Sequence, residues 1–297
     1  MNTFNQDNNF LAIDEKYSNY NDSKIVILPV PYEHTVSYGN GAAYGPEEII
    51  KASAYVEFYD DEFNNELCFD KGIATLLPIN LENCYDNIMI DKVTNLVTKL
   101  INDGKFVVTL GGEHTISTAP IKAHFNIYRN LSVLHFDAHS DLRDEYQGNK
   151  YSHASFAARV CEFLPNNKLT QVGIRAQCID EAKFIKDNNI NTFYSSGIKR
   201  GIYGVDWIQK VVDTLTDHIY ITFDVDFFDA SIMPATGTPE PDGFSYNDAL
   251  NIFRGIRNSG KKIVGFDIVE LAPIKDLSHP NFLAARLVYK LLNMALV

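Results

Sequence analysis

Three segments of the chain carry metal-ligand residue types directly after an apolar stretch. VVTL runs into Gly111–His114, SVLHF runs into Asp137–Asp141, and IYITF runs into Asp224–Asp226. In a parallel α/β sheet the carboxyl ends of the strands share one edge, where ligands bind. Three separated segments can therefore bring two imidazoles and four carboxylates to one place. The six residues are His114, Asp137, His139, Asp141, Asp224 and Asp226.

The spacing within the segments favours a common direction for the ligands. Asp137, His139 and Asp141 stand two residues apart, as do Asp224 and Asp226. In an extended chain, alternate side chains point to the same side. We therefore expect each segment to present its ligands together, from extended backbone.

The chemistry of this set predicts the metal. Imidazoles and carboxylates without a thiolate suit Mn²⁺ better than a structural zinc ion. Six protein ligands are too many for one catalytic ion with an open position, and they suit two ions about 3.5–4 Å apart. A lone Asp at a strand end is often only a cap, but three such clusters by chance are improbable. His135, which precedes Phe136, is interpreted as a packing residue or one that lies behind the ligands.

The elements that must position these residues alternate between strand and helix. Short runs that are apolar nearly throughout predict strands covered on both faces, and the segments between them carry apolar residues at helical spacing. This alternation predicts a mostly parallel sheet between layers of helices. No linker divides the chain, so residues 1–297 are expected to form one domain. The strands are expected at 24–30, 105–110, 131–137, 169–174, 218–226 and 261–271, and the helices at 87–103, 204–216, 245–258 and 281–296.

Composition excludes several classes of function. The 297 residues include 38 acidic and 26 basic side chains, for a formal net charge of −12. No cluster of Lys and Arg offers a stripe for phosphates, so a nucleic-acid partner is not expected. The four cysteines form no CxxC pair, which argues against a cysteine zinc site and a disulfide framework. No signal pattern and no apolar run of roughly 18 residues is present, so we expect a cytoplasmic protein with no membrane partner.

The Gly-rich segment 37–50 is the one place that suggests a nucleotide loop. Its glycines are spaced GxGxxxG rather than GxGxxG. Pro46 fits the first turn of a helix. The segment therefore predicts a tight loop that leads into a helix, and no organic cofactor is expected.

Longer motifs resemble the signatures of the ureohydrolase family of agmatinases and arginases. They are FDAHSDLRDEYQGNKYSHASF, FDVDFFDASIMPATGTPEPDGF, GFDIVELAP, TLGGEHTIS and PVPYEHTVSYGNGAAYGPEEI, so the resemblance spans nearly the whole chain. It implies an arginase/deacetylase-like, three-layer α/β/α fold with one parallel sheet. It also implies a homotrimer or homohexamer.

The resemblance further implies two Mn²⁺ ions per chain, bridged by Asp137 and Asp224. Two cations facing one water lower its pKa and make hydroxide available near neutral pH, to attack a guanidinium carbon. One ion would be held by His114, Asp137, Asp141 and Asp224, and the other by Asp137, His139, Asp224 and Asp226.

Two more residues match roles beyond metal binding and, with Asp141, complete the candidate catalytic set. His153, in KYSHASF, resembles the family histidine that shuttles protons near the leaving amine. Glu270, in DIVELAP, resembles the carboxylate that pairs with the substrate guanidinium. Alone, His153 would be read as a helix-start residue and Glu270 as half of a surface salt bridge.

The loop after Asp141 bears on the substrate. Arginases carry Asn and a Ser/Thr-rich stretch there, whereas Leu142–Tyr146 is similar to bacterial agmatinases. The resemblance therefore favours agmatine, cleaved to putrescine and urea, with Arg143 turned outward or paired with Asp144 or Glu145. Departures at Ala230-Ser231 and Asp242, in loops expected to shape the pocket, leave the tail of the substrate open.

Other functions remain as alternatives. Within the family they are guanidinobutyrase, arginase and formimidoylglutamase. Outside it they are a non-catalytic metal-binding interaction protein and a two-metal phosphoesterase. The retained ligand set speaks against the first of these, and the lack of a basic phosphate clamp speaks against the second.

Overall fold

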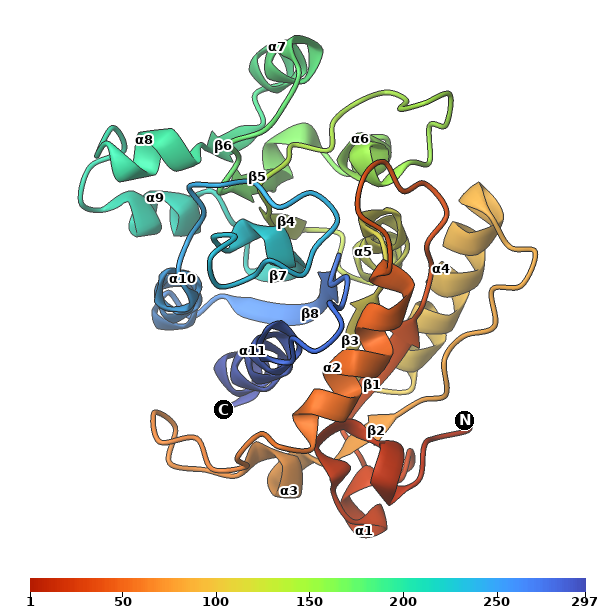
Figure 1. Cartoon of the computed structure of the whole chain (residues 1–297). Helices are drawn as coiled ribbons and strands as arrows, with labels where there is room; N and C mark the ends of the chain where they lie inside the picture. The colour runs from red at the N-terminus through yellow and green to blue at the C-terminus, as the bar shows by residue number, and fades with distance from the viewer.

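The computed structural model describes all of residues 1–297 and contains one eight-stranded sheet (Figure 1). Neighbouring strands are parallel throughout, in the order β2-β1-β3-β8-β7-β4-β5-β6, which confirms the predicted fold class. The strands are β1 (Ile25–Val30), β2 (Ile73–Thr75), β3 (Phe106–Gly111), β4 (Leu131–Phe136), β5 (Leu169–Val172), β6 (Asn191–Phe193), β7 (His218–Asp224) and β8 (Lys262–Val269).

Helices cover both faces of this sheet. None of them combines the length and the apolar character needed to cross a membrane. They are α1 (Glu15–Ser18), α2 (Gly45–Ser53), α3 (Leu67–Lys71), α4 (Asp86–Asn102), α5 (Thr118–Ile127), α6 (Phe156–Cys161), α7 (Ile179–Asn188), α8 (Ser195–Lys199), α9 (Trp207–Asp213), α10 (Tyr246–Asn258) and α11 (His279–Leu296).

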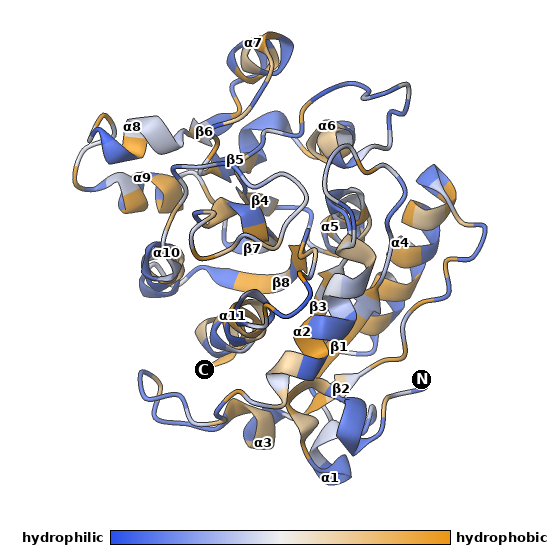
Figure 2. Cartoon of the chain, in the orientation of Figure 1, coloured by the Kyte–Doolittle hydropathy of each residue, from blue (hydrophilic) through white to orange (hydrophobic).

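Alternate residues of the strands define the two faces. In β1, Ile25 and Ile27 pack in a cluster of 46 buried residues with α2, α9, α10 and α11. Val26 and Leu28 point the other way, into a cluster with α4 and α5, and α6 covers the same face next to β4 and β5. Helices such as α4 mix hydrophobic and hydrophilic residues along their length, as expected when one stripe faces the sheet (Figure 2). The arrangement has three layers.

All six predicted strands are present, and the errors fall on short elements. The four predicted helices correspond to α4, α9, α10 and α11, and Pro46 lies in the first turn of α2 as expected. β2 and β6 were not predicted, because these edge strands of three residues each are too short to show a pattern. α5, α6 and α7, of six to ten residues, were not predicted either, because their helical stripe is short.

The strand order places the candidate residues side by side. β8 and β7, the last two strands of the chain, insert between β3 and β4. Phe136 lies opposite Phe223, and Asp224 lies opposite Val269. The residues after β3, β8, β7 and β4 therefore leave four adjacent strands at about the same level.

Candidate metal centre

One group of predicted ligands surrounds the His114 imidazole at the carboxyl edge of the sheet. Its Nδ1 lies 3.0 Å from Asp137 Oδ2, 3.4 Å from Asp141 Oδ2 and 3.3 Å from Asp224 Oδ2. All four side chains are buried. The residues after β3, β4 and β7 thus meet as the sequence predicted.

A second group surrounds His139, on the same side of the sheet. Its Nδ1 lies 2.9 Å from Asp226 Oδ2 and 3.5 Å from Asp137 Oδ1. Asp137 therefore contacts both imidazoles, one through each oxygen. Asp224 contacts His114, while its other oxygen accepts a hydrogen bond from the backbone N–H of Asp226 at 2.8 Å.

The expectation of extended backbone through these ligands is wrong. β4 ends at Phe136, and Asp141 adopts a left-handed conformation with φ 52°. Asp226 lies in a short 3₁₀ turn, Val225–Phe227. A hydrogen bond joins the turn after β4 to the turn after β7, since the Ala138 N–H donates to Asp226 Oδ1 at 2.9 Å. Tight turns at the strand ends, and not strand alternation, gather the ligands.

Hydrogen bonds set the protonation of His114 and test whether a cation fits. Thr222 donates its hydroxyl hydrogen to Asp267 at 2.8 Å, so the 2.9 Å bond between Thr222 and His114 requires a proton on His114 Nε2. Nδ1 faces three carboxylates, a setting that calls for a positive charge at this point. Burial acts against it, but the three carboxylates raise the pKa of His114 well above its ordinary value, so a second proton supplies that charge in the absence of a metal. A metal ion that displaced this proton would take the Nδ1 lone pair and the carboxylate oxygens as its ligands, so the residues fit a metal ion.

The electrostatics of the carboxylates lead to the same conclusion. Burial, and then the charge of Asp137, raise the pKa of Asp141 to about 6. Burial and the neighbouring carboxylates also raise the pKa of Asp224 well above its ordinary value. Burial opposes the ionisation of Asp137 as well, but its interactions with His135, His114 and His139 bring its pKa well below the usual range. A cation would favour the charged form of all these carboxylates.

His135 lies behind Asp137, which is one of the two interpretations that its sequence position allowed. Its Nδ1 accepts a hydrogen bond from Gln171 Nε2 at 3.0 Å, so its Nε2–H donates to Asp137 Oδ2 at 2.7 Å. Both ring nitrogens are thus engaged with protein partners. His135 orients Asp137 and offers no lone pair to an ion.

Glu270 follows β8 and faces the same space in a strained conformation. Its φ is 65°, a region that non-glycine residues occupy at a cost of about 1–3 kcal/mol and mainly at functional sites. Oε1 accepts the backbone N–H of His114 at 2.6 Å, and no Lys or Arg pairs with the carboxyl group. Burial raises its pKa to about 8, an effect that a nearby cation would reverse.

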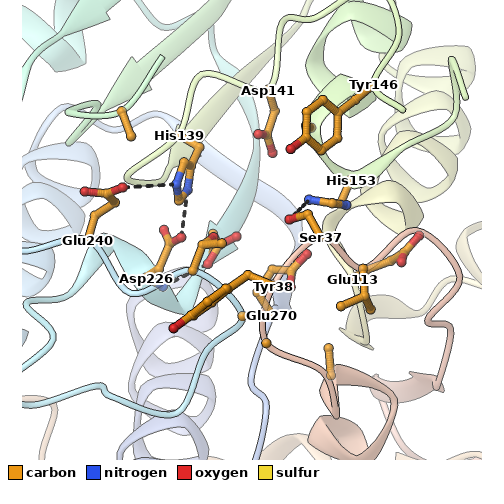
Figure 3. A pocket seen from close by; sticks show the side chains of 18 of the residues that line it. Ser37, Tyr38, Glu113, His139, Asp141, Tyr146, His153, Asp226, Glu240 and Glu270 are labelled. Atoms are coloured by element: carbon orange, nitrogen blue, oxygen red, sulfur yellow. Dashed lines mark hydrogen bonds and ion pairs between the residues drawn. The ribbon is translucent and has the colours of Figure 1, made fainter. Parts of the chain in front are cut away.

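His153 begins a 3₁₀ turn and faces the ligands from across a cavity (Figure 3). Its ring lies edge-on to Tyr146, with the centroids 6.0 Å apart. Burial lowers the pKa of His153, although the charge of Glu113 opposes the shift. The imidazole is therefore poised to be neutral.

The cavity, of about 290 Å³, is strongly acidic. Arg143 is the single arginine in its wall, and no lysine lines it. Eight carboxyl groups line it: Glu33, Glu113, Asp141, Glu181, Asp224, Asp226, Glu240 and Glu270. Such a wall favours a small cationic ligand over an anionic one.

Several of these lining residues were missed from the sequence. Glu113 stands next to His114 in the GGEH motif, but nothing in the spacing shows that its side chain turns toward His153. Glu181 and Glu240 carry no signal of their own, because Glu181 reaches the cavity from the first turn of α7 and Glu240 from a loop, and neither path is encoded locally.

The prediction for Arg143 is wrong. It lines the cavity and lies 3.8 Å from Glu181, with its guanidinium 5.1 Å from the ring centre of Tyr146. Asp144 pairs with Arg159 instead, at 2.9 Å.

The family departures at Ala230-Ser231 and Asp242 do not line the cavity. Asp242 has φ 64°, a conformation that glycine adopts without strain, and its carboxylate pairs with Lys199 at 2.6 Å. The departures therefore concern the neighbouring loops and not the cavity wall.

The position of Gly112 allows a prediction about the support of this site. A Cβ there would lie 2.0 Å from the carbonyl oxygen of Tyr32. Gly112→Ala should destabilise the fold by about 3 kcal/mol or more, since backbone must move, and it should weaken metal binding through His114. Gly104→Ala, where φ is 75° and space is open, should cost only about 1–2 kcal/mol. Thermal unfolding and metal content check both; equal losses would contradict the close approach.

Comparison with known proteins covers nearly the whole chain. A profile of the arginase family matches residues 23–293. An N(1)-aminopropylagmatine ureohydrolase from Synechocystis is 35% identical over 94% of this chain and 91% of its own length. An agmatinase from Bacillus anthracis is 31% identical over 93% and 96%.

Solved structures agree in fold. The crystal structure of agmatine ureohydrolase of Thermoplasma volcanium superposes with a TM-score of 0.82 at 31% identity, covering 93% of this chain and 91% of that one. An arginase from Medicago truncatula superposes with a TM-score of 0.78 at 27% identity, covering 91% and 86%. The acidic cavity over clustered His and Asp residues is thus found in a chain that belongs to the arginase family, a hydrolase of guanidino C–N bonds similar to bacterial agmatinases.

Proposed function

We propose that this chain is a binuclear Mn²⁺ ureohydrolase that converts agmatine to putrescine and urea. The observation that carries the proposal is the acidic cavity, whose wall holds eight carboxyl groups and one arginine. Three of the eight, Asp141, Asp224 and Asp226, belong to the two histidine-centred groups themselves. Agmatine carries a guanidinium at one end and an ammonium at the other, so both ends suit such a wall. The proposal includes the homotrimer or homohexamer and the cytoplasmic location that the sequence favours.

Metal binding is assigned to the six predicted residues. Asp137, which contacts both imidazoles, is the natural bridge between two ions, and Asp224 is proposed as the second. When bound, a pair of divalent ions supplies a water of lowered pKa near neutral pH. The ions are proposed to be held by His114, Asp137, Asp141 and Asp224 and by Asp137, His139, Asp224 and Asp226.

Two side chains would handle the organic substrate. Glu270 has no cationic partner in the protein, so its carboxylate is available to pair with the guanidinium. His153 reaches the cavity from the opposite wall and would give a proton to the leaving amine, help that is worth about 10²–10⁴ in rate.

N(1)-aminopropylagmatine is a second candidate substrate. The relative from Synechocystis carries that name at 35% identity, which exceeds the 31% of the agmatinase from Bacillus anthracis. Glu240 adds a carboxyl group that pairs with no Lys or Arg, and its side chain is 39% exposed. The second amine of this longer substrate, which is its third cationic group, would find a counter-charge there.

Metal loading and urea release test the proposal. The chain, freed of metal with a chelator and reloaded with Mn²⁺, should hold two ions per chain by elemental analysis and recover activity best with Mn²⁺. Urea should form from agmatine or N(1)-aminopropylagmatine faster than from arginine or guanidinobutyrate, and faster than formamide, the product of a formimino group, forms from formiminoglutamate. One ion or none in a folded protein would contradict the binuclear site. Metal without urea or formamide from any of the five would favour a non-catalytic, metal-binding role.

A further inference from the structure

We infer that Thr35 and Glu113 position His153 and hold it as the tautomer with its proton on Nδ1, so that Nε2 exchanges protons in the cavity. The inference rests on the proposed function only for the role of His153 in proton transfer. The tautomer itself follows from hydrogen bonds.

The hydroxyl group of Thr35 lies at the centre of this arrangement. Its Oγ1 is 3.0 Å from Glu113 Oε1 and 3.1 Å from His153 Nδ1. The backbone N–H of His153 donates to the same oxygen at 3.0 Å. His153 precedes α6 and Glu113 follows β3. Thr35 lies in the loop after β1, 118 residues away from His153.

A hydroxyl group has one hydrogen, and Glu113 takes it. Glu113 is 2% exposed, and its carboxylate accepts the backbone N–H groups of His34 and Thr35 at 2.8 and 2.7 Å and the hydroxyl of Thr115 at 2.8 Å. A bond to an ionised acceptor is roughly twice as strong as one between neutral groups. If Thr35 pointed its hydrogen at His153 instead, two oxygens 3.0 Å apart would have no hydrogen between them.

The remaining capacity of Thr35 is two lone pairs, which accept from His153. One accepts the backbone N–H and the other must accept Nδ1–H. Ser152 Oγ also lies near Nδ1, but at 3.5 Å, the limit of a hydrogen bond. In the neutral ring, a proton on Nδ1 leaves the lone pair on Nε2.

Nε2 faces the cavity. Ser37 Oγ lies 3.3 Å from it and is exposed, so its hydroxyl can donate to that lone pair (Figure 3). Only Nε2 can therefore take up a second proton and return it. As the scissile C–N bond breaks, its electron pair goes to the leaving nitrogen, which takes the Nε2 proton, and His153 returns to the neutral Nδ1–H form.

Glu113 and Thr35 are thus positioning residues, since neither needs to touch the substrate. When His153 carries both protons, the carboxylate of Glu113 stabilises the imidazolium through Thr35. The contacts from Glu113 through Thr35 to His153 fix the orientation of the imidazole, and no proton moves along them beyond His153. The spacing of these residues in the sequence did not indicate the contacts.

Nitrogen-15 magic-angle-spinning NMR of histidine-labelled protein reads the tautomer directly. The protein would carry Zn²⁺ in place of paramagnetic Mn²⁺, and the signals of His153 would be assigned by their loss in His153→Gln. We expect Nδ1 protonated and Nε2 bare at a pH where the ring is neutral. Thr35→Val, which keeps the shape but removes the hydroxyl, should shift population to the other tautomer. Ser37→Ala should leave Nδ1 protonated.

Kinetics supply the second readout. Thr35→Val should lower kcat for urea release about 10-fold or more, as part of the 10²–10⁴ that general acid catalysis contributes, with little change in KM or in Mn²⁺ content. Thr35→Ser, which restores the hydroxyl, should recover most of kcat. A purely structural role for Thr35 would instead lower thermal stability and metal content together.

The two proposals fail in distinguishable ways. A neutral wild-type His153 protonated on Nε2 would overturn the proposed role of Thr35 and Glu113, whatever the enzyme hydrolyses. A Thr35→Ser variant as slow as Thr35→Val would overturn it as well. Absence of urea from every guanidino compound would overturn the proposed function, and the NMR spectra alone would then decide the tautomer.

Discussion

Asp137→Asn should weaken metal binding and urea release together, each by about 10³-fold or more. Asp137 is the carboxylate that contacts both His114 and His139, so its charge acts on both proposed ions. Two unit charges 4 Å apart interact by about 4 kcal/mol at the effective dielectric of a protein, which corresponds to about 10³-fold in affinity. We expect Mn²⁺ affinity to fall by about this factor and kcat/KM to fall at least as far.

This loss should not come from unfolding. The amide oxygen of asparagine can still accept the hydrogen bond from His135, but its NH2 group cannot accept the backbone N–H of His139, which donates to the other oxygen of Asp137. The metal-free variant should therefore unfold at a somewhat lower temperature than the metal-free wild type, so metal binding is compared at a temperature where both are folded. Asp61→Asn, an exposed substitution far from the cluster in sequence, is the matched control and should retain metal and activity. Normal Mn²⁺ content in Asp137→Asn would remove Asp137 from the ligand set.

Arginine should be a poor substrate, with kcat/KM on the order of 10²-fold below that of agmatine. It adds a carboxylate to the guanidino chain, and a like charge placed among carboxylates costs several kcal/mol, where each 1.4 kcal/mol is tenfold. The cavity offers that carboxylate one cation, Arg143, whose charge is already countered by Glu181 at 3.8 Å.

Arg143→Ala tests whether this one cation selects the substrate. If Arg143 does not hold a carboxylate, the preference for agmatine over arginine should persist in the variant. Steady-state urea assays with both substrates on wild type and variant measure the two ratios. Similar kcat/KM values for the two substrates, with arginine turnover abolished by Arg143→Ala, would show that the enzyme acts as an arginase. That outcome would leave its family membership intact.

Much of the architecture is determined by local sequence. Apolar runs such as 24–30 and 131–137 can be satisfied only by strands covered on both faces, so the alternation of strand and helix already predicts a parallel sheet. The identity of the proposed ligands is local as well, because an Asp or His that ends or follows a strand lies at the carboxyl edge of the sheet. The resemblance to ureohydrolases rests on the same stretches of sequence.

Only the tertiary structure decided how these pieces meet. Nothing in residues 218–226 or 261–271 shows that β7 and β8 enter between β3 and β4, because strand order depends on packing between distant segments. The turns at Asp141 and Asp226 replaced the expected extended chain, since hydrogen bonds across strands, such as Ala138 to Asp226, stabilise them. Arg143 pairs with Glu181, at 3.8 Å, and not with its sequence neighbours Asp144 and Glu145.

The protonation of the histidines shows this division most clearly. The sequence by itself determined that His114 and His153 stand at positions where chemistry is expected. When a ring is neutral, the nitrogen that carries its proton depends on one hydroxyl hydrogen. For His114 it is the hydrogen that Thr222 donates to Asp267, and for His153 it is the one that Thr35 donates to Glu113. Those partners come from separate strands and loops, so the direction of each lone pair exists only once the chain has folded.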